Sequence, residues 1–202
     1  MARFDILRSA SNTFVSRSGT CALLLLCVLL FGSVTQTRAQ DAHLTNIIVT
    51  NTDTELLIFL SVEGAFQGKI NKAIDSGVPT TFYFLLHLYR TRSFWPDEQL
   101  ADVTVSHTIQ YNPLKKDYTV KRSWENNKPI TVASREEALR LMAEVDNLPI
   151  LPLSKLKKGA NYQIRTKAEL SKQTLPFYLH YVLFFVSWWD FETDWYTIDF
   201  IY

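Results

Sequence analysis

Apolar and polar residues alternate along residues 103–111, and this two-residue period restricts the fold more than any other feature of the chain. Val103, Val105, His107 and Ile109 fall on one side of the segment, and the residues between them are polar. Successive side chains of a β-strand point to opposite faces of a sheet, so this pattern predicts a strand with one buried face. Residues 44–50 also alternate regularly and are expected to form a strand. The other segments expected to form strands are 55–62, 79–95, 118–124 and 162–170.

Two segments change from the strand period to the spacing of a helix. Residues 66–75 place apolar side chains on one stripe, and Gly77 is expected to end that helix. Residues 134–145 form the second expected helix, which Ser134 and Glu137 open at the spacing of a capping box.

The remaining segments complete the expected fold. Residues 148–153 contain prolines and are expected to be a connection, and Pro176 is expected to start a short helix over residues 177–185. Short turns separate consecutive strands, so neighbouring strands should pair antiparallel. The sequence therefore predicts a β-rich α+β fold, a mainly antiparallel sheet or sandwich with two or three packed helices.

The N-terminal residues are typical of a secretory signal. Arginines precede an uncharged apolar run over residues 21–31, and small residues follow it. We expect cleavage after Ala39, which leaves residues 40–202 as a single exported domain in the periplasm or outside the cell. The alternative is that residues 1–39 stay as an uncleaved inner-membrane anchor, because Arg38 lies beside the cleavage site.

Both cysteines, Cys21 and Cys27, lie in the expected signal, so the exported domain would contain no thiol. This excludes disulfides, zinc–thiolate sites and cysteine nucleophiles there, and it favours a bacterial periplasm. The chain has a formal net charge of only +1, so it has no strong electrostatic attraction for nucleic acid. No phosphate-binding glycine loop, nucleophile elbow or zinc-protease motif is present, and we expect neither a cofactor nor an enzymatic activity.

Histidines and an arginine supply one candidate site. A hairpin centred near Asp97 would place His87 opposite His107, and a turn over residues 112–117 would pair His107 with Arg122. A group of two imidazoles and a guanidinium could bind an anion, or the imidazoles could hold a metal. The simpler interpretation is a buried, hydrogen-bonded histidine packed near an arginine stem.

Arg90, Arg92 and Trp95 form a second candidate, a basic and aromatic edge at the end of a long strand. Such an edge can hold a phosphate, a glycan or an acidic segment of a partner protein. Alternatively, the arginine stems only cover apolar surface at the wet end of the strand.

The last residues, 187–202, are rich in aromatic side chains, and the chain ends on Tyr202. The alternation over residues 196–202 resembles the last strand of an outer-membrane barrel, but the helical segments and the doubly apolar stretch 82–89 do not suit a small barrel. Acidic residues between the rings disfavour an anionic membrane, so membrane contact is expected to be peripheral at most. A strand that closes the core is the simplest interpretation.

Several short motifs occur in one order along the chain and carry a resemblance. They are Ala73–Pro79, Tyr89–Arg92, Phe94–Trp95, Ile109–Tyr111 with Tyr118, Glu136–Leu139, Lys158–Tyr162, Leu175–Pro176, and Trp189 with Trp195. Over residues 43–200 the chain resembles a family of exported proteobacterial proteins known as a domain of unknown function. The resemblance implies an extracytoplasmic protein with no established activity, and a partner in the envelope such as a membrane sensor.

These observations lead to three functional hypotheses. The first is a non-enzymatic periplasmic interaction module that binds an envelope protein through Arg90, Arg92 and Trp95, which are of residue types favoured at binding hot spots. The second is a small-ligand or anion-binding protein, or an unrecognised hydrolase, that uses the histidine and arginine group. The third is the outer-membrane barrel.

Overall fold

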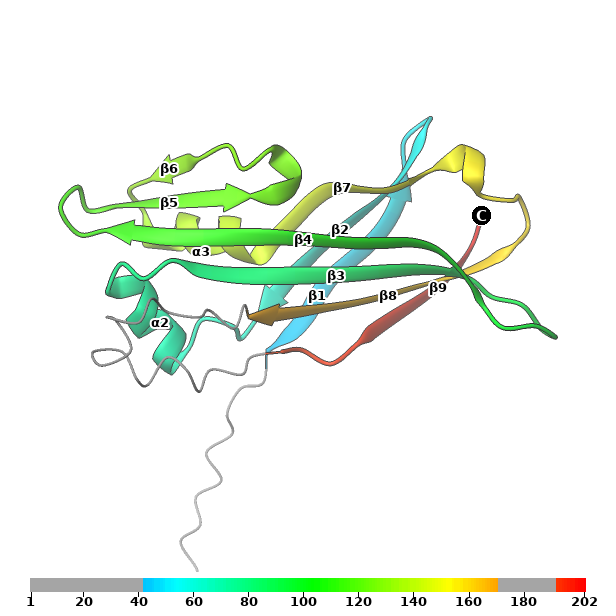
Figure 1. Ribbon diagram of the computed structural model, residues 1–202, viewed down its shortest axis with the longest axis horizontal. Coiled ribbons are helices and arrows are strands. Elements are labelled where there is room, and N and C mark those ends of the chain that lie inside the picture. The colour runs from blue at the N-terminus through cyan, green and yellow to red at the C-terminus, as the bar shows by residue number, and fades with distance from the viewer. Residues whose placement is uncertain (1–41, 171–191) are drawn as a thin grey trace, which may run out of the picture. The chain divides into compact units, whose positions relative to one another are not determined.

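Two antiparallel sheets form the part of the chain that the computed structural model describes, residues 42–170 and 192–202 (Figure 1). The first sheet has the order β1-β2-β7, and its strands are β1 (His43–Asn51), β2 (Glu55–Glu63) and β7 (Glu144–Pro152). The second has the order β6-β5-β4-β3-β8-β9. Its strands are β3 (Thr80–Arg90), β4 (Glu98–Asn112), β5 (Asp117–Arg122), β6 (Ile130–Val132), β8 (Asn161–Leu170) and β9 (Tyr196–Ile201).

Helices are short in the described residues. They are α2 (Gly68–Asp75), α3 (Arg135–Ala143) and the 3₁₀ turns η1 (Ser123–Glu125) and η2 (Leu153–Lys155). Most of the ordered structure is therefore antiparallel β, and the predicted β-rich α+β class is confirmed.

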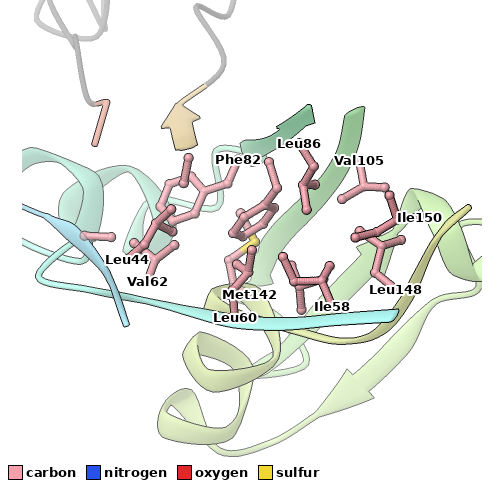
Figure 2. Packing of buried hydrophobic residues seen from close by; sticks show 14 of the residues in the cluster. Leu44, Ile58, Leu60, Val62, Phe82, Leu86, Val105, Met142, Leu148 and Ile150 are labelled. Carbon is pink, nitrogen blue, oxygen red and sulfur yellow. The ribbon is translucent and has the colours of Figure 1, made fainter. Parts of the chain in front are cut away.

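One hydrophobic core lies between the two sheets. Figure 2 shows Phe82 of β3 and Val105 of β4 on one side, Leu60 of β2 on the other, and Met142 of α3 between them. The inner strands β3, β4, β5 and β8 bury alternate side chains in this core over most of their length, as the predicted alternation along β4 and β8 requires. The side chains at the intervening positions form the outer face of the six-stranded sheet.

Strand β1 departs from the regular alternation that its sequence predicts. Asn46 adopts a left-handed conformation, with φ of 52°, and the pairing with β2 changes register between Thr45 and Ile48. Such a bulge inserts one extra residue and reverses the faces beyond it. Leu44 is therefore buried before the bulge, whereas Val49 rather than Ile48 packs against the core after it.

Strand β7 corrects the interpretation of residues 134–153. The second helix ends at Ala143 rather than near Val145, and the expected connection is a strand that pairs with β2. Pro149 and Pro152 lack a backbone donor, which is why these residues did not indicate a strand. An edge strand tolerates them, because one side of it needs no ladder hydrogen bonds, and β7 is the edge of its sheet in the described residues.

Helix α2 ends as its sequence predicts. The backbone N–H of Gly77 donates to the Ile74 carbonyl, and that of Val78 donates to the Ala73 carbonyl, which is the hydrogen-bond pattern of a Schellman motif. Gly77 has a φ of 76°, in the region that favours glycine. A Cβ at this position would lie 3.0 Å from the Tyr111 carbonyl oxygen, so this helix end also needs a small residue against β4.

Replacing Gly77 with alanine is expected to lower the free energy of unfolding by about 1–2 kcal/mol through backbone strain, with a further loss from the contact with Tyr111. Gly159→Ala is the matched control, since Gly159 has a φ of 73° and no atom within 4 Å of the added Cβ. Urea denaturation of both variants should rank Gly77→Ala as the more damaging. An equal loss in the two variants would contradict the role of the Tyr111 contact.

The C-terminal aromatic residues form the outer strand of the six-stranded sheet. β9 pairs with β8 at the edge of the sheet (Figure 1). The Phe200 ring stacks on the Tyr162 ring with centroids 5.5 Å apart. Ile198 and Phe200 are half-buried on one face of β9, whereas Thr197, Asp199 and Ile201 on the other face are exposed, so the strand closes the core with one side only. The helix expected over residues 177–185 lies outside the described residues. Among the helices that the structure describes, none has the length and apolar character needed to cross a bilayer.

Candidate functional site

The hairpin of β3 and β4 separates the three residues of the predicted anion or metal site. His87 lies opposite Asp102, and His107 lies opposite Phe82, so the predicted pairing of His87 with His107 is wrong. The loop comprises residues 91–97, which places the turn before Asp97, and a register shift between Leu88 and Tyr89 then reverses the relative faces of the two strands. His87 therefore lies on the outer face of the sheet and His107 in the core. The predicted pairing of His107 with Arg122 is confirmed.

His107 is fully buried, and both of its ring nitrogens have partners. The indole Nε1 of Trp124 lies 3.0 Å from His107 Nε2, and an indole N–H can only donate. Nε2 must therefore accept, and the ring proton lies on Nδ1, which donates to the Met142 carbonyl oxygen at 3.0 Å. This pair of hydrogen bonds requires the neutral imidazole.

Burial dominates the electrostatics of His107 and lowers its pKa to about 4. The hydrogen bond to the Met142 carbonyl opposes this shift, and the positive charge of Arg122 adds to it. The imidazole therefore stays neutral at physiological pH.

Arg122 is almost as buried as His107 and binds the same end of helix α3. Its Nε and Nη2 atoms donate to the Leu141 carbonyl oxygen at 3.2 and 3.0 Å, and Nη1 lies 3.4 Å from Glu125 Oε1. The last carbonyls of a helix have no partner within the helix. The pair of His107 and Arg122 thus satisfies two of these carbonyls. The positive charge of Arg122 also interacts favourably with the negative C-terminal end of the helix dipole.

The structure therefore favours the simpler interpretation of the histidine and arginine pair. The nitrogens of His107 are occupied, and Arg122 is bound to a carbonyl and a carboxylate. Within residues 42–170 and 192–202, no three His, Cys, Asp or Glu side chains converge at metal-binding distance.

Arg90 and Arg92 fasten the base of the hairpin loop. The terminal nitrogens of both contact the same Glu98 carboxylate oxygen, and the Arg92 backbone N–H donates to Asp97 Oδ1 at 3.3 Å. The backbone N–H of Thr91 donates to the carbonyl oxygen of residue 161 on β8 at 3.0 Å. These contacts hold the loop on the end of the sheet.

The aromatic tip of this loop consists of Phe94 and Trp95. Their side chains are 94% and 74% exposed, which are high values for such large apolar residues. Trp95 was a predicted binding residue. Phe94 belongs to the same basic and aromatic stretch, residues 89–95, but was not itself named as a binding candidate.

A groove on the outer face of the sheet contains the third predicted residue, His87. Its volume is about 450 Å³, and the side chains that line it come from three adjacent strands and the residue before β9. They are His87, Tyr89, Gln163, Arg165, Trp195 and Thr197. Sequence reasoning missed Arg165 and Trp195 as partners of His87, because the pairing of β3 with β8 joins segments that are not consecutive strands.

Polar and charged contacts surround the groove. His87 Nε2 lies 3.4 Å from Asp102 Oδ1. Burial alone would lower the pKa of Lys167, but hydrogen bonds to Glu192 and Glu169 raise it above its ordinary value. The charge of Lys167 is thus neutralised by two carboxylates.

Comparison with known proteins gives a family and no activity. No curated protein and no solved structure matches the chain. The family described as Domain of unknown function (DUF4390) matches residues 39–199, which is most of the chain, and the protein therefore belongs to this family.

Proposed function

We propose that the protein is a non-enzymatic interaction module that works outside the cytoplasm and binds an envelope protein through the tip of the β3–β4 hairpin. The signal-like residues 1–39 support export, and the absence of cysteine after residue 27 suits a Gram-negative periplasm. The resemblance to exported proteobacterial proteins supports an envelope partner, such as the outer domain of a membrane sensor.

The observation that carries this proposal is the exposure of Phe94 and Trp95 on an anchored loop. Two adjacent aromatic side chains offer a large apolar area to a partner, and tryptophan is enriched at binding hot spots. The ion pairs of Arg90 and Arg92 with Glu98 hold the base of the loop before any partner binds. A preorganised loop loses less conformational entropy on binding.

The arginines take a supporting role in this proposal. Both are already paired with Glu98, and only 17% of the Arg90 side chain is exposed. They position the tip, and the aromatic rings make the contact. The non-enzymatic character is supported by His107 and Arg122, since the contacts of this pair with α3 leave no site for a substrate between them.

The tip is tested by crosslinking in living cells, followed by capture of the tagged protein from the envelope and mass spectrometry. Trp95→Ala is expected to weaken capture of the dominant partner by about 30-fold or more, as loss of a hot spot of about 2 kcal/mol would. Phe94→Ala should add to this effect. Neither variant should unfold the protein, because both side chains face solvent.

Leu114→Ala is the matched control, since Leu114 is 94% exposed in the turn between β4 and β5. Its capture should equal that of the wild type. Unchanged capture by the Trp95→Ala and Phe94→Ala double variant would overturn the assignment of the tip as the binding surface.

A further inference from the structure

The groove beside His87 offers a second binding surface that does not depend on the proposed role of the hairpin tip. It lies on the outer face of β3, β8 and β9, which are adjacent in the sheet (Figure 1). Across these strands His87 pairs with Arg165, and Arg165 pairs with Thr197. A volume of about 450 Å³ is in the range of small-molecule sites.

Arg165 differs from every other arginine of the described residues. Each of the others contacts a carboxylate: Arg90 and Arg92 contact Glu98, Arg122 contacts Glu125, Arg135 contacts Asp75, and Arg140 contacts Glu144. Arg165 has no carboxylate partner within residues 42–170 and 192–202. Among the arginines of the described residues, Arg165 is therefore the one whose guanidinium is available to an anion.

The guanidinium of Arg165 is nevertheless held in place. Its Nε donates to Gln163 Oε1 at 2.6 Å, and its central carbon lies 4.9 Å from the centroid of the Tyr89 ring. Gln163 is in turn fixed by its Nε2, which donates to Asp199 Oδ1 at 2.9 Å. A guanidinium fixed by one nitrogen and one aromatic face presents its terminal nitrogens as a fork, which matches a carboxylate.

Aromatic rings form the other wall of the groove. The Trp195 ring lies 5.1 Å from the His87 ring, centroid to centroid, and the Lys167 ammonium lies 5.4 Å from the Trp195 centroid. The Trp195 side chain remains 46% exposed. An exposed indole supported by neighbouring groups can stack on the face of a sugar or an aromatic ring.

The charges around the groove select the kind of anion. Lys167 is neutralised by Glu169 and Glu192, and Asp102 and Asp199 add negative charge at the rim. The surrounding carboxylates outnumber the cations, so they repel a phosphate dianion more strongly than a monoanion, and the fork of Arg165 must supply the attraction for the monoanion. We propose that the groove binds a carboxylate carried on a ring, with Arg165 holding the carboxylate and Trp195 contacting the ring.

The test measures the binding of four matched probes to the purified protein by tryptophan fluorescence and by amide chemical shifts. Glucuronate and benzoate carry a carboxylate on a sugar and on an aromatic ring, glucose lacks the charge, and acetate lacks the ring. Saturable binding of glucuronate or benzoate is expected, and glucose and acetate should bind at least about tenfold more weakly. If glucuronate binds more tightly than benzoate, the ring is a sugar; if benzoate binds more tightly, the ring is aromatic. Inorganic phosphate should not compete.

Arg165→Gln is the diagnostic variant, and Arg140→Gln is its control. Arg165 is exposed, so its loss should leave the melting temperature of the protein unchanged. The affinity for the ring-bearing carboxylate should fall by at least about tenfold. Arg140 lies on α3 and contacts Glu144, so its loss should leave binding unchanged. Wild-type affinity in Arg165→Gln, tighter binding of phosphate, or no response to either ring acid would each overturn the proposal. Partner capture by Arg165→Gln should stay normal, which separates this site from the hairpin tip.

Discussion

Lowering the pH from 7 to 4 is expected to reduce the free energy of unfolding by about 3 kcal/mol through His107 alone. The pKa of His107 is about 4 in the folded protein and about 6.5 in the unfolded chain. A difference of about 2.5 pH units, at 1.36 kcal/mol per unit, gives this value. Above pH 6.5 the imidazole is neutral in both states, so it adds no pH dependence there. Between pH 6.5 and 4 only the unfolded chain takes up the proton, and stability falls.

The physical reason lies in the hydrogen bonds of the ring. A protonated His107 could no longer accept from Trp124 Nε1, and it would place a buried charge near Arg122. Burial disfavours the charged form first, and the Arg122 charge adds to that effect.

His107→Gln separates this effect from the carboxylates that titrate in the same range. The variant should be less stable than the wild type at pH 7, and the gap between the two proteins should narrow steadily as the pH falls to 4. Urea denaturation at several pH values measures this gap. His43→Gln is the control, because His43 is exposed on β1, and this variant should keep the wild-type slope. A constant gap between wild type and His107→Gln would contradict the lowered pKa.

Phe84→Ala is expected to lower the free energy of unfolding by about 3–5 kcal/mol. Phe84 is fully buried on β3, which pairs with β4 on one side and β8 on the other. Its ring lies 4.8 Å from the His107 ring, centroid to centroid. Truncation therefore removes buried apolar area and leaves a cavity beside a buried histidine.

Two further variants calibrate the loss at Phe84. Phe84→Leu keeps much of the volume and should be clearly less damaging than Phe84→Ala. Leu114→Ala removes an apolar side chain that is exposed and should change stability by less than about 0.5 kcal/mol. Denaturation midpoints at pH 7 measure all three. A loss below about 1 kcal/mol in Phe84→Ala would show that the site collapses or that β3 is not central to the core.

Much of the second sheet followed from patterns within single strands. The alternation along β4 predicted that Val105, His107 and Ile109 share a buried face, and it was confirmed. The turn after β4 predicted the pairing of His107 with Arg122, and this pairing was confirmed. A short turn fixes the register of its two strands, so this part of the site could be read locally.

Other features depended on partners that the local pattern does not encode. The register of β3 and β4 depends on a loop closed by Arg90, Arg92 and Glu98 and on a register shift between Leu88 and Tyr89, neither of which the turn residues alone indicated. The prolines of β7 concealed an edge strand that β2 completes. The role of His107 depends on the end of α3, where its partner Met142 lies 35 positions further along the chain.

The sequence by itself determined the β-rich class, the two described helices with their start at Ser134 and stop at Gly77, and the buried faces of β4 and β8. These properties depend on the period of side chains along one segment and on local backbone conformation. Only the tertiary structure decided that His87 leaves the core site and joins Arg165 and Trp195 in a groove. That grouping arises from the pairing of β3 with β8 and of β8 with β9, which is set by packing across the whole sheet rather than by neighbours in the chain.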